Sequence, residues 1–145
     1  RSAMSADLWT DADVIHVYSR TQAIEDGNLV DVSQLAKQCG FRFPLAMTRG
    51  VWDDCVAWTD ADQAGYALEQ SEGIRLENLL QYAYMEIKRH KREDEGDAQE
   101  LFFAVCRLPR DPVNSREPLR QDLKIHFGPG DNGEPVLTVM FPEED

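Results

Sequence analysis

The stretch AIEDGNLVDVSQLAKQCGFRFPLAMTRGVWDDCVAW, residues 23–58, holds the densest succession of local structure signals in the chain. Residues 23–27 predict a helical turn closed by a glycine, and residues 29–32 predict a short apolar strand. Ser33 is expected to be the N-cap of a helix that ends at Gly40. These closely spaced turns and caps predict a small α/β unit.

The second half of the same stretch predicts one more strand and one more helix. Residues 41–47 alternate like a half-buried strand that is interrupted by Pro44, and Thr48 is expected to cap a short helix. Nothing in the stretch supplies a nucleophile with its base, or a complete set of metal ligands. The stretch therefore indicates the fold but no catalytic or metal-binding function. The apolar positions of the short helix are Val51, Trp52, Cys55, Val56 and Trp58.

Toward the N-terminus the signals become weaker. Residues 1–12 are expected to be a tag remnant and a flexible N-terminus, and residues 13–145 a single α+β domain. Residues 14–18 alternate enough to predict a first strand, and Ser19 is expected to cap the helical turn that follows.

Downstream, a polar segment precedes the longest predicted helix. Residues 59–73 are bounded by glycine and predict a surface loop with a helical turn. Residues 74–90 carry an apolar stripe at spacings of three and four, which predicts a helix packed on a sheet. The stripe consists of Leu76, Leu79, Leu80, Ala83, Tyr84 and Ile87.

The C-terminal third predicts an antiparallel meander. Residues 100–108 form a nearly continuous apolar run, which is typical of a central strand. Residues 122–127 alternate strictly, and a turn containing residues 130–133 joins them to a returning strand at 136–141. The predicted fold class is α+β: a C-terminal antiparallel β-meander with one long helix packed on it, and an N-terminal α/β half of short strands and helices.

Composition narrows the class of protein. The chain has 145 residues, a hydrophobic fraction of 42% and a formal net charge of −12. Polyanion binding needs a basic surface, so we expect no free nucleic acid as partner. No apolar run reaches the roughly 18 residues that span a bilayer, and we expect a cytoplasmic protein without a membrane contact. The acidity has two interpretations, solubility alone or a surface that imitates nucleic acid toward a basic partner.

The cysteines and histidines favour structural roles. Cys39, Cys55 and Cys106 lie far apart in apolar patterns, which predicts buried, reduced thiols. Residues 60–65 resemble the opening of a calcium loop but lack two of its ligands. We expect no metal, no cofactor and no catalytic residue. The histidines fall on separate predicted elements: His16, His90 and His126.

Two groups of charged residues are candidate binding sites. The first is the densest acidic patch, expected to contact a protein partner: Asp53, Asp54, Asp60, Asp62, Glu69 and Glu72. The alternative is an anion site formed by Arg20, Arg42 and Arg49, which could instead pair with nearby acids such as Asp53.

Two blocks of sequence resemble a known family. They are VYSRTQAIEDGNLVDVS together with GFRFPLAMTRGVWDDCV, within residues 17–56, and GPGDNGEPVLTVMFPEED at residues 128–145. On these blocks the chain resembles small acidic proteins of unknown function encoded by bacteria, plasmids and phages. The resemblance implies an accessory role in a mobile element or its bacterial host, and it supplies no assigned active site.

Charge and resemblance together give the functional hypothesis. The chain is expected to be a non-enzymatic accessory protein that binds a protein partner, in its most concrete form a counter-defence protein whose acidic surface occupies a basic, nucleic-acid-binding site on a host protein. The alternative hypothesis is a small enzyme or ligand-binding domain that uses an arginine-lined pocket between the long helix and the N-terminal half. The sequence leaves the oligomeric state open.

Overall fold

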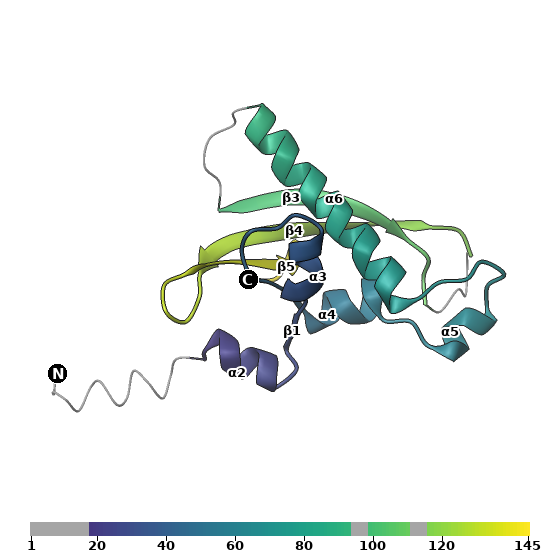
Figure 1. Ribbon diagram of the computed structural model, residues 1–145. Coiled ribbons are helices and arrows are strands. Elements are labelled where there is room, and N and C mark those ends of the chain that lie inside the picture. The colour runs from purple at the N-terminus through teal and green to yellow at the C-terminus, as the bar shows by residue number, and fades with distance from the viewer. Residues whose placement is uncertain (1–17, 94–98, 111–115) are drawn as a thin grey trace, which may run out of the picture.

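The protein is an α+β fold built on one five-stranded sheet, seen here in a computed structural model that describes residues 18–93, 99–110 and 116–145. The strand order is β1-β2-β5-β4-β3. Figure 1 shows the long helix α6 lying across the strands. The strands are β1 (Leu29–Asp31), β2 (Leu45–Thr48), β3 (Glu100–Arg107), β4 (Leu119–Pro129) and β5 (Pro135–Met140).

The predicted C-terminal hairpin is confirmed. Strand β4 pairs antiparallel with β5, with Ile125 opposite Val139 and Pro129 opposite Pro135. Gly133 in the connecting turn has φ of 80°, a left-handed conformation that glycine adopts without a steric cost. Leu123 and Ile125 of the predicted apolar face are fully buried, but Lys124 between them is buried as well and pairs with Glu100.

The N-terminal strands do not form a separate layer. Strand β1 pairs antiparallel with β2, and β2 pairs parallel with β5 along Leu45 to Met47. The predicted N-terminal α/β half therefore shares one sheet with the C-terminal meander. The two paired segments are about 90 residues apart in the chain, a separation comparable to the length of a typical domain. Such a pairing leaves no local signal in the sequence.

The prediction that residues 100–108 form a central strand is wrong. Strand β3 pairs with β4, with Phe103 opposite Leu123, and lies at one end of the strand order. Its apolar run is explained by the helix above it, because Leu101, Phe103 and Val105 are buried while the intervening Phe102 is 60% exposed. A covered edge strand and a central strand can have equally apolar sequences.

Helix α3 (Ser33–Gln38) corrects the predicted cap. Its N-cap is Val32, and Ser33 is the first helical residue. The Ser33 hydroxyl donates to the Asp31 carboxylate at 2.6 Å and accepts from the Leu45 amide at 2.9 Å. The serine thus joins the end of β1 to the start of β2. The chain leaves this helix through Gly40, whose φ is 110°.

The predicted caps at Ser19 and Thr48 are confirmed. Ser19 forms a capping box with Gln22 at the start of α2 (Arg20–Glu25). Residues 14–17 of the predicted first strand lie outside the described residues, and Tyr18 precedes the helix without joining a strand. Thr48 caps α4 (Arg49–Val51), which continues directly into η1 (Trp52–Val56), a π-helical turn.

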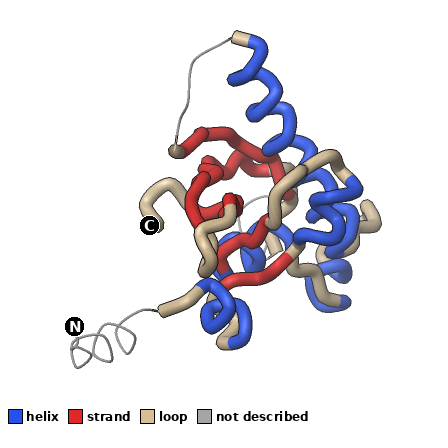
Figure 2. Tube along the Cα trace, turned by 60° about the vertical axis from the view of Figure 1, so that its left-hand side comes forward, coloured by secondary structure: helices blue, strands red, loops and turns tan. Residues whose placement is uncertain are grey.

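Two further helices complete the fold. The polar segment after Trp58 contains α5 (Asp60–Ala64), capped by Thr59. Helix α6 (Glu72–Arg92) begins after its cap Ser71, two residues before the predicted start, and covers the predicted stripe. Figure 2 shows it running along one side of the strands. In the described part of the chain, no helix is long and apolar enough to cross a membrane.

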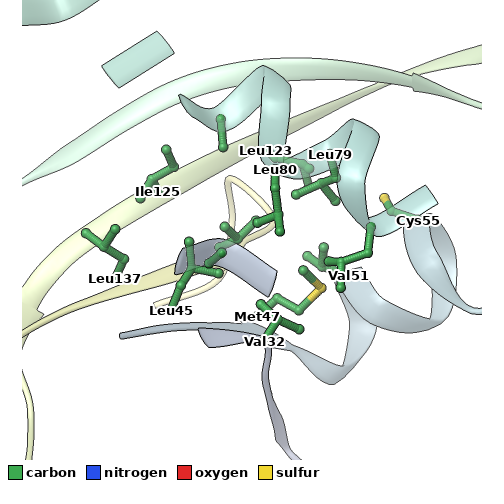
Figure 3. Packing of buried hydrophobic residues seen from close by; sticks show 14 of the residues in the cluster. Val32, Leu45, Met47, Val51, Cys55, Leu79, Leu80, Leu123, Ile125 and Leu137 are labelled. Atoms are coloured by element: carbon green, nitrogen blue, oxygen red, sulfur yellow. The ribbon is translucent and has the colours of Figure 1, made fainter. Parts of the chain in front are cut away.

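The core lies between α6, the short helices and one face of the sheet. Leu79 and Leu80 from α6 meet Leu123 and Ile125 from β4. Figure 3 shows these side chains converging with residues from the N-terminal strands and helices. The core therefore draws on both halves of the sequence, and it fixes the position of α6 relative to η1. The N-terminal contributions include Val32, Leu45, Met47, Val51 and Cys55.

Candidate functional site

A buried arginine organises the surface around the start of α6. Arg75 is only 4% exposed. Its guanidinium donates to the backbone oxygens of Val56 at 3.1 Å, Leu108 at 3.0 Å and Asp54 at 3.0 Å. It also lies 4.7 Å from the centre of the Trp58 ring, a cation–π distance. Burial lowers the pKa of Arg75 from its usual value. One side chain thus joins η1, α6 and the end of β3.

Two acids of the predicted acidic patch are held by arginines. Asp54 accepts from the Arg107 guanidinium at 3.0 Å, and Asp62 accepts from Arg110 at 2.8 Å. The second arginine also donates to the backbone oxygen of Asp53 at 2.9 Å. These ion pairs join η1 and α5 to the segment around β3. Asp54 and Asp62 are therefore not free charges on the surface.

Asp62 has a second role at the start of α5. Burial opposes its ionisation, but hydrogen bonds from Thr59 and from Arg110 outweigh that effect and lower the pKa of Asp62. The Thr59 amide donates to its carboxylate at 2.8 Å, which completes a capping box. Its carboxylate stabilises the helix and the ion pair together.

Four acids of the predicted patch remain exposed: Asp53, Asp60, Glu69 and Glu72. Asp53 has a carboxylate oxygen 3.8 Å from the Arg49 guanidinium, a contact open to solvent. Glu69 lies between α5 and α6, and Glu72 lies in the first turn of α6. The structure therefore divides the patch into two partly buried carboxylates held by arginines and four exposed ones.

Gln63 holds the segment that carries Glu69. Its side-chain oxygen accepts from the Trp58 indole at 2.9 Å and from the Gln70 amide at 2.9 Å. Its side-chain nitrogen donates to the Leu68 carbonyl at 2.9 Å. Within the predicted surface loop at residues 59–73, the Gln63 side chain thus holds the part from Leu68 to Gln70 against α5. That anchoring sets the position of Leu68.

A pocket of about 130 Å³ opens beside this segment. Buried side chains, among them Cys55, Leu79 and Val105, form its inner wall together with Arg75. Exposed apolar residues also line it, from the segment before α6, from α6, from β3 and from the segment before β4. These are Leu68, Tyr82, Cys106 and Pro118, and we call them the apolar rim.

The three arginines of the predicted anion site have different contacts. Arg20 donates to the Thr138 hydroxyl at 2.7 Å and to the Leu137 carbonyl at 2.8 Å, and burial lowers its pKa. Arg49 donates to the Gly27 carbonyl at 2.9 Å. Arg42 lines a different pocket, near the C-terminal half of α6. The guanidiniums of Arg20 and Arg49 are therefore used by contacts within the protein, and an anion site shared by all three arginines stays a prediction.

The cysteines differ more than the sequence predicts. Cys55 is buried, and burial raises the pKa of its thiol to about 12. Cys39 is half-buried, whereas Cys106 is exposed on the edge strand β3. The prediction of buried thiols is therefore wrong for Cys106, because its alternate position on the strand points away from the core. All three thiols are free, as predicted.

The described residues hold no cluster of three histidine, cysteine or acidic side chains that could bind a metal. His90 lies near the end of α6 and His126 on β4. His16 lies outside the described residues.

Sequence reasoning missed Arg75, the residue that connects most of the site. Position 75 lies four residues before Leu79, so it falls on the buried side of α6. An arginine at that spacing is a detectable signal, because a charged side chain on an apolar stripe requires hydrogen-bond partners. Its three carbonyl partners could not be read from the sequence.

Comparison with known proteins identifies a family, but the function of that family is unknown. A family model described as a family of unknown function, DUF6573, matches residues 5–145. No similar curated protein and no similar solved structure was found.

Proposed function

Since the chain belongs to a family of unknown function, DUF6573, we propose its role from the geometry of the site: it is a non-enzymatic binding protein whose partner is another protein. The partner contacts the apolar rim and the exposed acids beside it. The resemblance to small acidic proteins of bacteria, plasmids and phages supports an accessory role for this binding.

The apolar rim is the observation that carries the proposal. Leu68 is 64% exposed and Tyr82 is 43% exposed, yet both border the same pocket. Exposed apolar side chains that gather around a depression are typical of protein interfaces, whereas isolated ones are common on any surface. The pocket accepts an apolar side chain of the partner, in the manner of an interface anchor.

The neighbouring charges define the chemistry of the partner. Glu69 follows Leu68 directly, and Glu72 begins α6. An apolar centre bordered by carboxylates matches the usual division of an interface into an apolar core and a polar rim. The complementary partner surface has a protruding apolar side chain with lysine or arginine residues around it. A basic, nucleic-acid-binding protein has such a surface, as the counter-defence hypothesis requires.

The internal arginines support binding through pre-organisation. Arg75 and Arg107 fix the elements on two sides of the pocket before any partner arrives. Ordering mobile elements on binding would oppose association, so a fixed surface binds more tightly for the same contacts.

Capture from a host lysate with paired variants tests the proposal. Leu68→Ser should remove the captured partner, while Met85→Ser should retain it, because Met85 is also 64% exposed but does not border the pocket. Glu69→Lys with Glu72→Lys should lower capture at least tenfold at low salt and should reduce its salt dependence. The matched charge control is Glu25→Lys with Glu143→Lys, which changes exposed acids elsewhere.

Two results would contradict the proposal. One is equal loss of capture in Leu68→Ser and Met85→Ser. The other is capture that is unaffected by salt and by the change at Glu69 and Glu72. Thermal melts of all variants must show retained folding, so that a loss of capture reports on the surface.

A further inference from the structure

A second pocket lies on the other half of α6, between that helix, the segment after α3 and the sheet. Its volume is about 180 Å³, larger than the pocket at the apolar rim, and the two pockets share no lining residue. It is lined by Gly40, Phe41, Arg42, Phe43, Tyr84, Ile87, Lys88, Lys91, Phe127 and Leu137.

Aromatic rings form much of the wall of this pocket. Phe41 and Tyr84 pack edge to face with their ring centres 5.6 Å apart. Phe41 is buried, but Phe43 is 44% exposed two residues later, so one ring is part of the core and the other is available at the mouth. Such rings present faces on which a flat ligand can stack.

Three basic side chains line the same pocket as these rings. Arg42 is exposed in the segment after α3, and Lys88 and Lys91 lie on neighbouring turns of α6. Among the described residues, none of these side chains forms a salt bridge or a hydrogen bond, and Lys88 has a distant contact of 5.8 Å with the Tyr84 ring. The chain carries 27 acids against 15 bases, so unpaired cations gathered at one pocket are unexpected.

We infer that this pocket binds a small aromatic anion, a single flat ring that carries a phosphate or carboxylate group. The ring packs among Phe41, Phe43 and Tyr84, and the anionic group lies toward Arg42, Lys88 and Lys91. The size fits, because an apolar cavity of about 150 Å³ accepts benzene and this one has about 180 Å³. The Arg42 guanidinium can donate two parallel hydrogen bonds to a carboxylate or a phosphate group.

This site differs from the one predicted from the sequence. Arg42 is the only predicted arginine that reaches it, and the other cations come from the basic end of α6. Cations in a last helical turn also stabilise the helix dipole. That role does not require rings beside them, so the combination of rings and cations is what points to a ligand.

Binding of simple probes tests the inference. Phenyl phosphate and benzoate present a ring with an anion, inorganic phosphate presents the anion alone, and benzyl alcohol presents the ring alone. We expect phenyl phosphate or benzoate to bind at least tenfold more tightly than either single-feature probe, measured by calorimetry. Amide shifts in nuclear magnetic resonance should centre on Gly40, Tyr84 and Phe127. The preferred probe of the first pair identifies the anionic group.

Variants identify the groups responsible. Lys88→Gln with Lys91→Gln should weaken binding of the preferred probe at least tenfold, while the matched double change Lys37→Gln with Arg116→Gln should leave it unchanged, because those exposed cations lie outside the pocket. Phe43→Ser should weaken binding without unfolding, since that ring is partly exposed. Leu68→Ser should have no effect, which separates this test from that of the protein-binding proposal.

Three results would overturn the inference. They are the absence of shifts at the pocket with millimolar phenyl phosphate and benzoate, equal affinity for inorganic phosphate, and unchanged affinity after Lys88→Gln with Lys91→Gln.

Discussion

At the scale of single residues, Arg75 shows how a charge is kept inside a small acidic domain. Its guanidinium donates to three backbone carbonyls, two in η1 and one just after β3, and lies against Trp58. The bonds to Val56 and Leu108 are buried, and a buried carbonyl left without a donor costs about 1–3 kcal/mol. A planar guanidinium can serve several carbonyls at once, whereas a lysine ammonium is a point charge with a different geometry.

The first prediction is that Arg75→Lys destabilises the protein by about 1–3 kcal/mol, because at least one buried carbonyl loses its donor. Urea melts measure the change. Arg120→Lys is the control, since its salt bridge with Asp122 is exposed, and exposed pairs contribute about 0–1 kcal/mol. Equal effects of the two substitutions would mean that Arg75 contributes nothing beyond a surface arginine.

The second prediction concerns the thiols. In the folded protein at pH 8, Cys106 should react quickly with a thiol reagent, because it is exposed on an edge strand. Cys55 should react only on unfolding, because it is buried and its pKa is raised to about 12. Mass spectrometry of the labelled peptides distinguishes the two sites. Rapid native labelling of Cys55 would contradict the burial of η1.

The raised pKa of Cys55 also affects stability at high pH. The folded state keeps the proton up to about pH 12, whereas an unfolded thiol loses it near pH ~8.5. The unfolded state therefore binds fewer protons in that interval. The contribution of this thiol to stability is complete below the unfolded pKa and is lost as the pH rises toward the folded value.

At the scale of elements, the β4–β5 turn holds the first described helix. The Asp131 carboxylate accepts from the Arg20 amide at 2.7 Å, the Thr21 amide at 3.0 Å and the Thr21 hydroxyl at 2.8 Å. The hydroxyl bond from Thr21, followed by the two amide bonds, lowers the pKa of Asp131. Helix α2 is therefore attached to the sheet by a residue far along the chain.

The third prediction is that acid releases α2 before the core unfolds. A lowered folded pKa means that the stabilisation is present above the unfolded value near ~3.9 and is lost as the pH falls through the folded value. The protection factors of the α2 amides, which correct for the intrinsic exchange rate at each pH, should fall below about pH 4 while the Ile125 amide stays protected. Asp131→Asn should accelerate α2 exchange at neutral pH. Unchanged α2 exchange in that variant would show that the contact does not hold the helix.

At the scale of the whole molecule, the net negative charge affects the stability of the folded state. The formal net charge of −12 creates repulsion between exposed carboxylates that opposes the compact state. The more buried salt bridges, such as Lys124 with Glu100, are screened less by salt than exposed charges.

The fourth prediction is that moderate salt stabilises the protein. Raising sodium chloride from about 0.01 M to about 0.15 M shortens the Debye length from about 30 Å to about 8 Å. Long-range repulsion then weakens while the short ion pairs persist, so the melting temperature should rise. Glu25→Gln with Glu143→Gln should show a smaller rise. A melting temperature that falls with salt would mean that attractive ion pairs outweigh the net repulsion.

The sequence by itself determined the local structure of most segments. The cap at Thr48, the stripe of α6 and the hairpin around Gly133 all follow from contacts within a few residues. These signals are reliable because each depends on backbone conformation and on which face of one element is apolar.

The sequence did not determine how the segments meet. The parallel pairing of β2 with β5, the pairing that places β3 at the edge and the hydrogen bonds from α2 to Asp131 all join residues distant in the chain. The candidate sites depend on the same long-range contacts. Arg107 pairs with Asp54, and Arg42 lines the same pocket as Lys88 and Lys91 only because α6 packs beside the segment after α3. The physical reason is that periodicity reports which side of an element is buried, while packing alone decides which other element buries it.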